Sequence, residues 1–139
     1  MSTPHTQAGF REVAHTADWE IEVWAPDLCM LIEQAARGMY VLTGTRLASG
    51  PRLQRALLLP ADDRESLLVG FLTELLYLSE VDGIGFDRFE LRLDEESLSA
   101  SLKGAHIESM QKEIKAVTYH GLSIRETEAG LEANLVFDV

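Results

Sequence analysis

The stretch that most constrains the fold of this chain is residues 113–121, EIKAVTYHG, where polar side chains interrupt a run of β-branched and aromatic residues. Such a composition predicts a β-strand, whose side chains alternate between two faces. One face would carry Glu113, Lys115, Val117 and Tyr119, and the other Ile114, Ala116, Thr118 and His120. A half-solvated strand has one apolar face, and a fully buried strand is almost entirely apolar. This strand is neither, so we expect its polar groups to have assigned partners elsewhere in the fold.

Length and composition limit how the chain can be organised. A chain of 139 residues is long enough for one domain with a single core and too short for two. We expect a polar tail over residues 1–9 and one domain over residues 10–139. The tail lacks the basic start and apolar segment of a secretory signal, and no apolar run is long enough to cross a bilayer. These features predict a cytoplasmic protein that does not contact a membrane.

Cysteine content and charge exclude several kinds of chemistry. Cys29 is the only cysteine, so the chain can form neither an intramolecular disulfide nor a cysteine-based zinc site. The formal net charge of −11 repels phosphate backbones and weighs against direct nucleic-acid binding. A basic protein partner or a cation suits this charge better. The alternative is that the acidity serves only solubility.

Hydrophobic periodicity predicts the element order ββαβαβββββ. Asp27 is the expected N-cap of the first helix, and Asp62 with Glu65 forms a capping-box pattern at the start of the second. This order favours an α+β two-layer sandwich, with two helices packed on one face of a largely antiparallel, mixed sheet. The predicted strands are residues 10–15, 19–25, 53–59, 86–93, 97–103, 113–121, 122–127 and 131–139, the helices are 27–43 and 62–78, and residues 104–111 form a loop.

The end of the sequence provides a candidate cation site. Asp138 points away from the apolar face of the last predicted strand, beside Val139, whose α-carboxylate we expect to be free. Adjacent carboxylates raise each other's pKa unless a cation or a basic group lies nearby. Lys115 is a candidate to neutralise them, and Asp18 is a candidate to supply another oxygen to a divalent cation. The alternative is a solvated strand end without a ligand.

Two histidines are weaker candidates. Asp18 follows His15 by three residues, a spacing that allows a hydrolytic or an imidazole–metal site, and His120 lies in the central predicted strand. No serine, second cysteine or glycine-rich loop is placed to complete a catalytic set. Structural, hydrogen-bonded roles are therefore favoured for both histidines. Lys115 is either a phosphate contact or the partner of a neighbouring carboxylate.

Four segments together resemble the archease family. They are His15–Asp18 (HTAD), residues 66–78 (SLLVGFLTELLYL), residues 115–121 (KAVTYHG) and residues 137–139 (FDV). The similarity runs in order from about Phe10 to Val139, and its most specific parts are KAVTYHG and the terminal aspartate. The resemblance implies a small α+β protein.

The resemblance also implies a function. Archeases are non-enzymatic cofactors of the RtcB-type tRNA-splicing ligase, which help GTP to guanylylate the active-site histidine of the ligase and so restore multiple turnover. Their calcium-type metal site corresponds here to Asp18, Asp138 and Val139. Lys115 is similar to a lysine tied to activation, and the flanking motif residues expected at the partner contact are His15, Tyr119 and His120.

Two departures from the family pattern bear on the partner contact. Many relatives carry an acidic residue where this chain has Ala14, and the expected loop over residues 104–111 is shorter than is common. Two other classes of function stay open. One is a small metal-dependent phosphohydrolase that uses Asp18, His15 and Asp138, and the other is a chaperone-like modulator of nucleic-acid enzymes.

Overall fold

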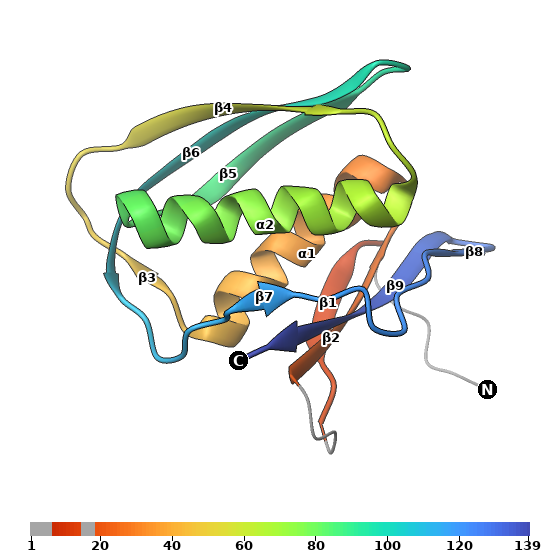
Figure 1. The fold of residues 1–139 in the computed structure, drawn as a ribbon, viewed down its shortest axis with the longest axis horizontal. Coiled ribbons are helices and arrows are strands. Elements are labelled where there is room, and N and C mark those ends of the chain that lie inside the picture. The colour runs from red at the N-terminus through yellow and green to blue at the C-terminus, as the bar shows by residue number, and fades with distance from the viewer. Residues whose placement is uncertain (1–6, 15–18) are drawn as a thin grey trace.

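A computed structural model describes residues 7–14 and 19–139, in which two helices and nine strands follow one another along the chain (Figure 1). The helices are α1 (Leu28–Thr43) and α2 (Arg64–Asp82). The strands are β1 (Gly9–Glu12), β2 (Trp19–Ala25), β3 (Arg46–Leu47), β4 (Leu53–Pro60), β5 (Ile84–Leu93), β6 (Ser97–Ser109), β7 (Ala116–Val117), β8 (Arg125–Thr127) and β9 (Gly130–Asp138). No helix in this part of the chain is both long and apolar enough to cross a membrane.

The strands form two antiparallel sheets. A five-stranded sheet has the order β1-β2-β9-β7, and β8 pairs with β9 as well. In a four-stranded sheet, β6 is central and pairs with β3, β4 and β5. The predicted α+β class, with two helices packed on antiparallel strands, is confirmed. The structure adds that there are two sheets where we expected one, because the alternation within a strand does not specify which strand lies beside it.

The two helices join the sheets into one core. Helix α1 contacts β1, β2 and β9 of one sheet and β5 of the other, and α2 contacts β4 and β5 as well as β7 (Figure 1). Helix α1 buries one apolar stripe, and α2 buries apolar residues around much of its circumference. The largest fully buried side chains include Phe71, Phe137, Ile21, Leu31, Ile32, Met39, Leu68 and Leu72.

Helix boundaries follow their caps. Asp27 is the N-cap of α1, as predicted, because its Oδ1 accepts a hydrogen bond from the Met30 backbone N at 2.8 Å. The prediction for α2 was wrong by one residue: Asp63, not Asp62, caps it by accepting from the Ser66 N at 2.8 Å. Helix α2 also runs four residues further than the predicted end, until Gly83 adopts the left-handed conformation at φ 64°.

Strand β6 corrects the predicted loop over residues 104–111, because it continues to Ser109. Its second half pairs with the beginning of β5 and with β3, so partners from two other segments extend it. Gly104 permits the close approach of β6 to β5. A Cβ on Gly104 would lie 1.8 Å from the Gly85 carbonyl oxygen.

The strand predicted over residues 113–121 was also largely wrong. Only Ala116–Val117 form a strand, β7, and the chain turns at Gly121, where φ is 65°. The first strand ends at Glu12 rather than at residue 15, and β8 covers only Arg125–Thr127 of the predicted 122–127. His15 lies outside the described residues.

Replacing Gly104 by alanine should lower the free energy of unfolding by about 2 kcal/mol, because the new methyl group would force β5 and β6 apart. Denaturant unfolding followed by circular dichroism measures the change. Gly70→Ala in α2 is the matched control, since its Cβ would meet nothing within 4 Å. Helix propensity predicts a gain of about 0.5 kcal/mol for that control. Equal effects of the two substitutions would contradict the close approach at Gly104.

Acid should weaken the N-cap of α2 and the turn between β5 and β6, because an aspartate accepts backbone hydrogen bonds in each. The backbone N–H of Ser66 lowers the pKa of Asp63, and those of Glu96 and Ser97 lower the pKa of Asp94. A carboxyl whose pKa is lower in the folded state adds stability above its unfolded pKa, and this stability is lost as the pH falls through the folded value. We expect an Asp63→Asn/Asp94→Asn variant to lose less stability than the wild type between about pH 5 and about pH 2. Urea unfolding at each pH tests this, and parallel curves would contradict it.

Candidate functional site

The segment KAVTYHG lies along the last strand of the chain. Ala116 pairs with Asp138 and Val117 with Phe137 in the β7–β9 ladder. Just before this ladder, the Lys115 N donates a hydrogen bond to the Asp138 carbonyl oxygen at 2.8 Å. The backbone of Lys115 therefore lies beside Asp138, and the predicted role of its side chain in neutralising the carboxylates stays a prediction. We call Lys115, Asp138 and Val139 the C-terminal corner.

Burial fixes the backbone of this corner and leaves its charged side chains in solvent. Phe137 is 1% exposed and Val117 is 8% exposed, so their side chains anchor β9 and β7 in the core. Asp138 follows Phe137 and faces the other way, and both Asp138 and Lys115, the residue just before β7, are exposed. The corner thus presents one carboxylate and one ammonium group on backbone that the core holds in place.

Strand β2 flanks β9 on its other side. Trp19, the residue after Asp18 in the sequence, pairs with Phe137, the residue before Asp138. The Lys112 ammonium lies over the Trp19 ring at 4.7 Å from its centroid, which links the start of β2 to the segment that leads into β7. Asp18 itself, like His15, lies outside the described residues, so its predicted role stays a prediction.

Tyr119 and His120 lie in the turn beyond β7. Tyr119 is 57% exposed, and its carbonyl oxygen accepts from the Leu122 N at 3.0 Å. His120 is exposed, and its backbone N donates to the Thr118 Oγ1 at 3.2 Å. Across residues 7–14 and 19–139, no hydrogen bond or ion pair joins either side chain to the C-terminal corner. These two predicted residues are therefore neighbours of the corner in the chain, but no described contact brings them to it.

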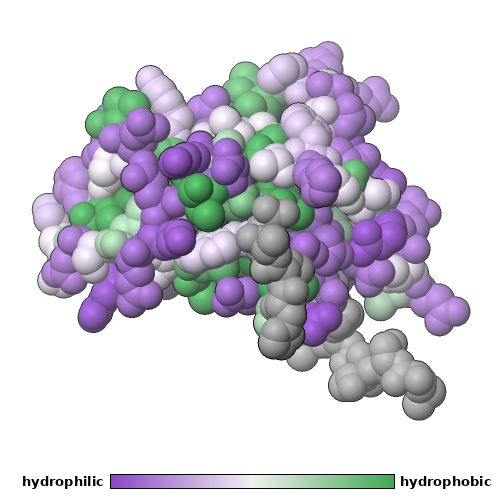
Figure 2. Space-filling model, turned by 60° about the horizontal axis from the view of Figure 1, so that its bottom comes forward, coloured by the Kyte–Doolittle hydropathy of each residue, from purple (hydrophilic) through white to green (hydrophobic). Residues whose placement is uncertain are grey.

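The corner offers oxygen donors for a hard cation, which prefers several oxygen ligands including carboxylates. Among the residues that the structure describes, no three His, Cys, Asp or Glu side chains come together as a metal site. A site at the corner would therefore need donors in addition to Asp138. The exposed face on the side of the five-stranded sheet is largely hydrophilic, with smaller apolar patches (Figure 2).

Sequence reasoning missed a hollow of about 400 Å³ beside the corner. Its walls come from the C-terminal ends of α1 and α2 and from residues 110–115, including Lys115. Ile114 is buried at 5% exposure and ties this segment to the core. The one sequence signal was the apolar Ile114 between charged neighbours, which we assigned to a strand face rather than to the wall of a hollow.

Comparisons with known proteins agree on one family. A model of the archease protein family (MTH1598/TM1083) matches residues 10–139. The chain is 38% identical to the protein archease of Methanosarcina mazei, and the match covers 94% of this chain and 95% of that protein. It is 30% identical to the archease of Methanothermobacter thermautotrophicus, and the match covers 94% of this chain and 99% of that protein.

Solved structures support the same fold. The solution structure of Methanobacterium thermoautotrophicum protein 1598 superposes with a TM-score of 0.72 at 26% identity, covering 94% of this chain and 99% of that one. A Thermotoga maritima crystal structure, described as an archease and possible chaperone, superposes with a TM-score of 0.69 at 22% identity. The superposition covers 100% of this chain and 98% of that one. The second likeness bears on the fold alone.

Thr118→Val tests how the segment beyond β7 is held. The Thr118 Oγ1 donates to the Val136 carbonyl oxygen at 3.0 Å and accepts from the His120 N. Losing these bonds should lower the free energy of unfolding by about 1 kcal/mol and speed hydrogen exchange at the His120 amide. Thr73→Val, on the exposed side of α2, is the control and should leave that exchange rate unchanged. Unaltered exchange in both variants would contradict the role of Thr118.

Proposed function

Because the chain belongs to the archease family, we propose that it is a non-enzymatic accessory protein of an RtcB-type RNA ligase. It promotes guanylylation of the ligase by GTP and allows each ligase molecule to turn over many times, in tRNA splicing or RNA repair. The observation that carries this proposal is the C-terminal corner, where KAVTYHG lies against the strand that ends in Asp138.

We further propose that Asp18, Asp138 and Val139 hold a divalent cation, with calcium as the ion best suited to oxygen donors. The exposed Asp138 carboxylate fits such a ligand set, and the pairing of Trp19 with Phe137 supports the approach of Asp18. The bound ion would supply positive charge that offsets repulsion among these carboxylates. Asp138 is fixed for this role by the buried Phe137 beside it.

Lys115 contacts the partner in this proposal, together with His15, Tyr119 and His120. The backbone hydrogen bond from Lys115 to Asp138 fixes where its side chain begins, and this exposed side chain can extend its ammonium group to an acidic or phosphate group. The net charge of −11 favours encounter with a basic surface on the ligase. Complementary charge of this kind mainly raises the association rate and the specificity.

A turnover assay tests the proposal. Catalytic amounts of an RtcB-type ligase are mixed with excess RNA and GTP, with and without this protein, and ligated product per ligase molecule is counted. We expect more than one product per ligase only when the protein is present. Asp138→Asn should reduce product to the level without the protein, because the substitution removes the carboxylate charge and keeps the side-chain size.

Glu95→Gln, in the turn between β5 and β6 of the other sheet, is the matched control and should activate fully. Calcium binding to the isolated protein, measured by titration calorimetry, should be lost in Asp138→Asn and kept in Glu95→Gln. An unchanged product count with wild-type protein would disprove the activator role. Hydrolysis of phosphorylated substrates by the isolated protein would favour the phosphohydrolase alternative instead.

A further inference from the structure

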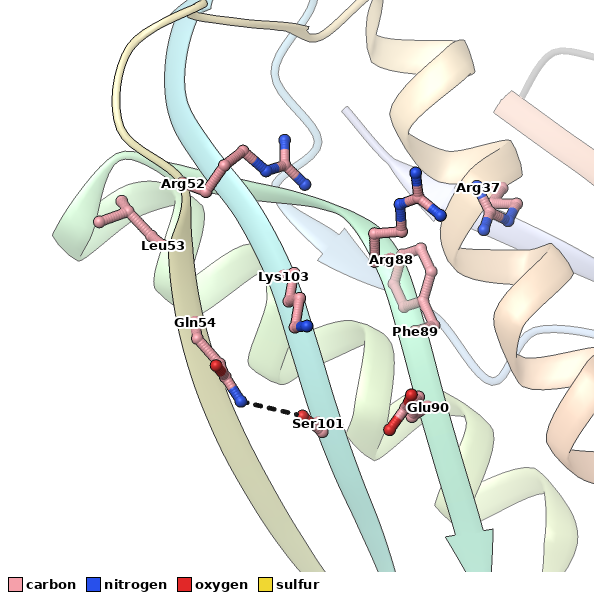
Figure 3. Close-up of a pocket in the computed structure, with 9 residues that line it drawn as sticks. All are labelled: Arg37, Arg52, Leu53, Gln54, Arg88, Phe89, Glu90, Ser101 and Lys103. Atoms are coloured by element: carbon pink, nitrogen blue, oxygen red, sulfur yellow. Dashed lines mark hydrogen bonds between the residues drawn. The ribbon is translucent and has the colours of Figure 1, made fainter.

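A hollow of about 710 Å³ lies on the outer face of the four-stranded sheet, on the side away from α2 (Figure 3). Its lining comes from β4, β5 and β6, from Arg52 just before β4, and from Arg37 on α1. The C-terminal corner belongs to the other sheet. The hollow is therefore separate from the site proposed above.

Positive charge gathers in this hollow although the chain as a whole is acidic. Four of the twelve Lys and Arg residues line it, in a chain with a formal net charge of −11. Glu90 is the one carboxylate among the described lining residues. The four cationic residues are Arg37, Arg52, Arg88 and Lys103.

Strand register places two of these cations directly opposite each other. Lys103 on β6 is the partner of Arg88 on β5 and also of Gln54 on β4, so the three residues form one row across the sheet. Like charges in directly opposite positions destabilise an antiparallel pair. Within residues 7–14 and 19–139, neither Arg88 nor Lys103 has a carboxylate within salt-bridge distance. An anion bound between them would offset this repulsion.

The other two cations are held at the rim by partners of their own. Arg52 makes a two-pronged ion pair with Asp87 and still has 51% of its side chain exposed. Arg37 donates to Glu33 at 3.0 Å, and its guanidinium lies 5.1 Å from the centre of the Phe89 ring. Both guanidinium groups are thus preorganised, which lowers the entropy lost when a ligand binds.

Neutral hydrogen-bonding groups complete the lining. The Gln54 Nε2 donates to the Ser101 Oγ at 3.3 Å on the floor of the hollow (Figure 3). Arginine, lysine, hydroxyl and amide groups are the usual contacts of phosphate oxygens. The chemistry of the lining therefore matches a phosphorylated ligand better than an apolar one.

The spacing of the cations indicates the size of the ligand. Neighbouring strands lie about 4.8 Å apart, so the backbones of β4 and β5, on either side of β6, are separated by about 10 Å. The cations project from β5, from β6 and from Arg52 just before β4, and a single phosphate is small for this span. Two linked phosphoryl groups carry the charge and the length to contact all three.

A long nucleic-acid strand fits less well. Platforms for single strands use exposed aromatic rings on which bases stack, whereas the lining ring, Phe89, is half-buried and covered by Arg37. The acidic remainder of the chain would repel the phosphates that extend beyond the hollow. We propose that this hollow binds a small ligand through a diphosphate group, either free diphosphate or a diphosphate ester.

Titration calorimetry with inorganic pyrophosphate tests the proposal. Wild-type protein should bind it, and an Arg88→Gln/Lys103→Gln variant should bind at least about tenfold more weakly, because charge-assisted hydrogen bonds are lost. Arg46→Gln, an exposed cation on β3 outside the hollow, is the matched control and should bind like the wild type. An Asp138→Asn variant should also bind normally, which separates this site from the C-terminal corner.

Thermal unfolding supplies a second measurement. Without ligand, the double variant should be about as stable as the wild type, since removing the opposed like charges offsets the lost attraction between Arg88 and Asp87. Pyrophosphate should raise the melting temperature of the wild type and not that of the variant. The proposal is overturned if wild-type protein does not bind pyrophosphate or if the variant binds it equally well. Equal affinity for orthophosphate, or tighter binding of oligonucleotides as they lengthen, would overturn the diphosphate assignment.

Discussion

The pairing of β9 on both sides is the interaction on which the rest of the structure depends. Residues near the end of the chain pair with β2, from near its beginning, and with β7 and β8. Alternate residues of β9, namely Ala133, Leu135 and Phe137, are at most 1% exposed and join the core. The same alternation turns Asp138 outward. Core packing and the position of the C-terminal corner therefore have one cause, which is the register of a single strand.

The two proposed binding sites lie on different sheets. The five-stranded sheet carries the carboxylate of the C-terminal corner, and the outer face of the four-stranded sheet carries the cluster of Arg37, Arg52, Arg88 and Lys103. Such separation is possible because both helices lie against strands of both sheets and keep the charged surfaces apart. Under the two proposals, a protein with formal net charge −11 offers a carboxylate to a cation at one site and a cluster of cations to an anion at the other.

Local signals predicted much of the fold. The N-cap Asp27 and the full extent of β2 could be predicted from the sequence because neighbouring residues determine them. The continuation of β6 to Ser109 could not, since distant segments supply its partners. In residues 113–121, mixed polarity reflected an irregular segment with a two-residue ladder, not a regular strand with buried polar groups.

The candidate site was only partly accessible from the sequence. Lys115 was predicted to neutralise the terminal carboxylates, and the structure joins its backbone N to the Asp138 carbonyl oxygen, while the role of its side chain stays a prediction. The basic hollow was not foreseen, because its members come from α1 and three strands and converge only through the register of β6 with β4 and β5.

The long separation between β2 and β9 also bears on how the chain folds during synthesis. Trp19 cannot pair with Phe137 until all the residues between them have left the ribosome. By then residues 53–109 have emerged, and β4, α2, β5 and β6 can already contact one another. The four-stranded sheet is thus free to form first, while α1 keeps one apolar side uncovered. The nascent chain is most exposed to aggregation and to chaperones in that interval.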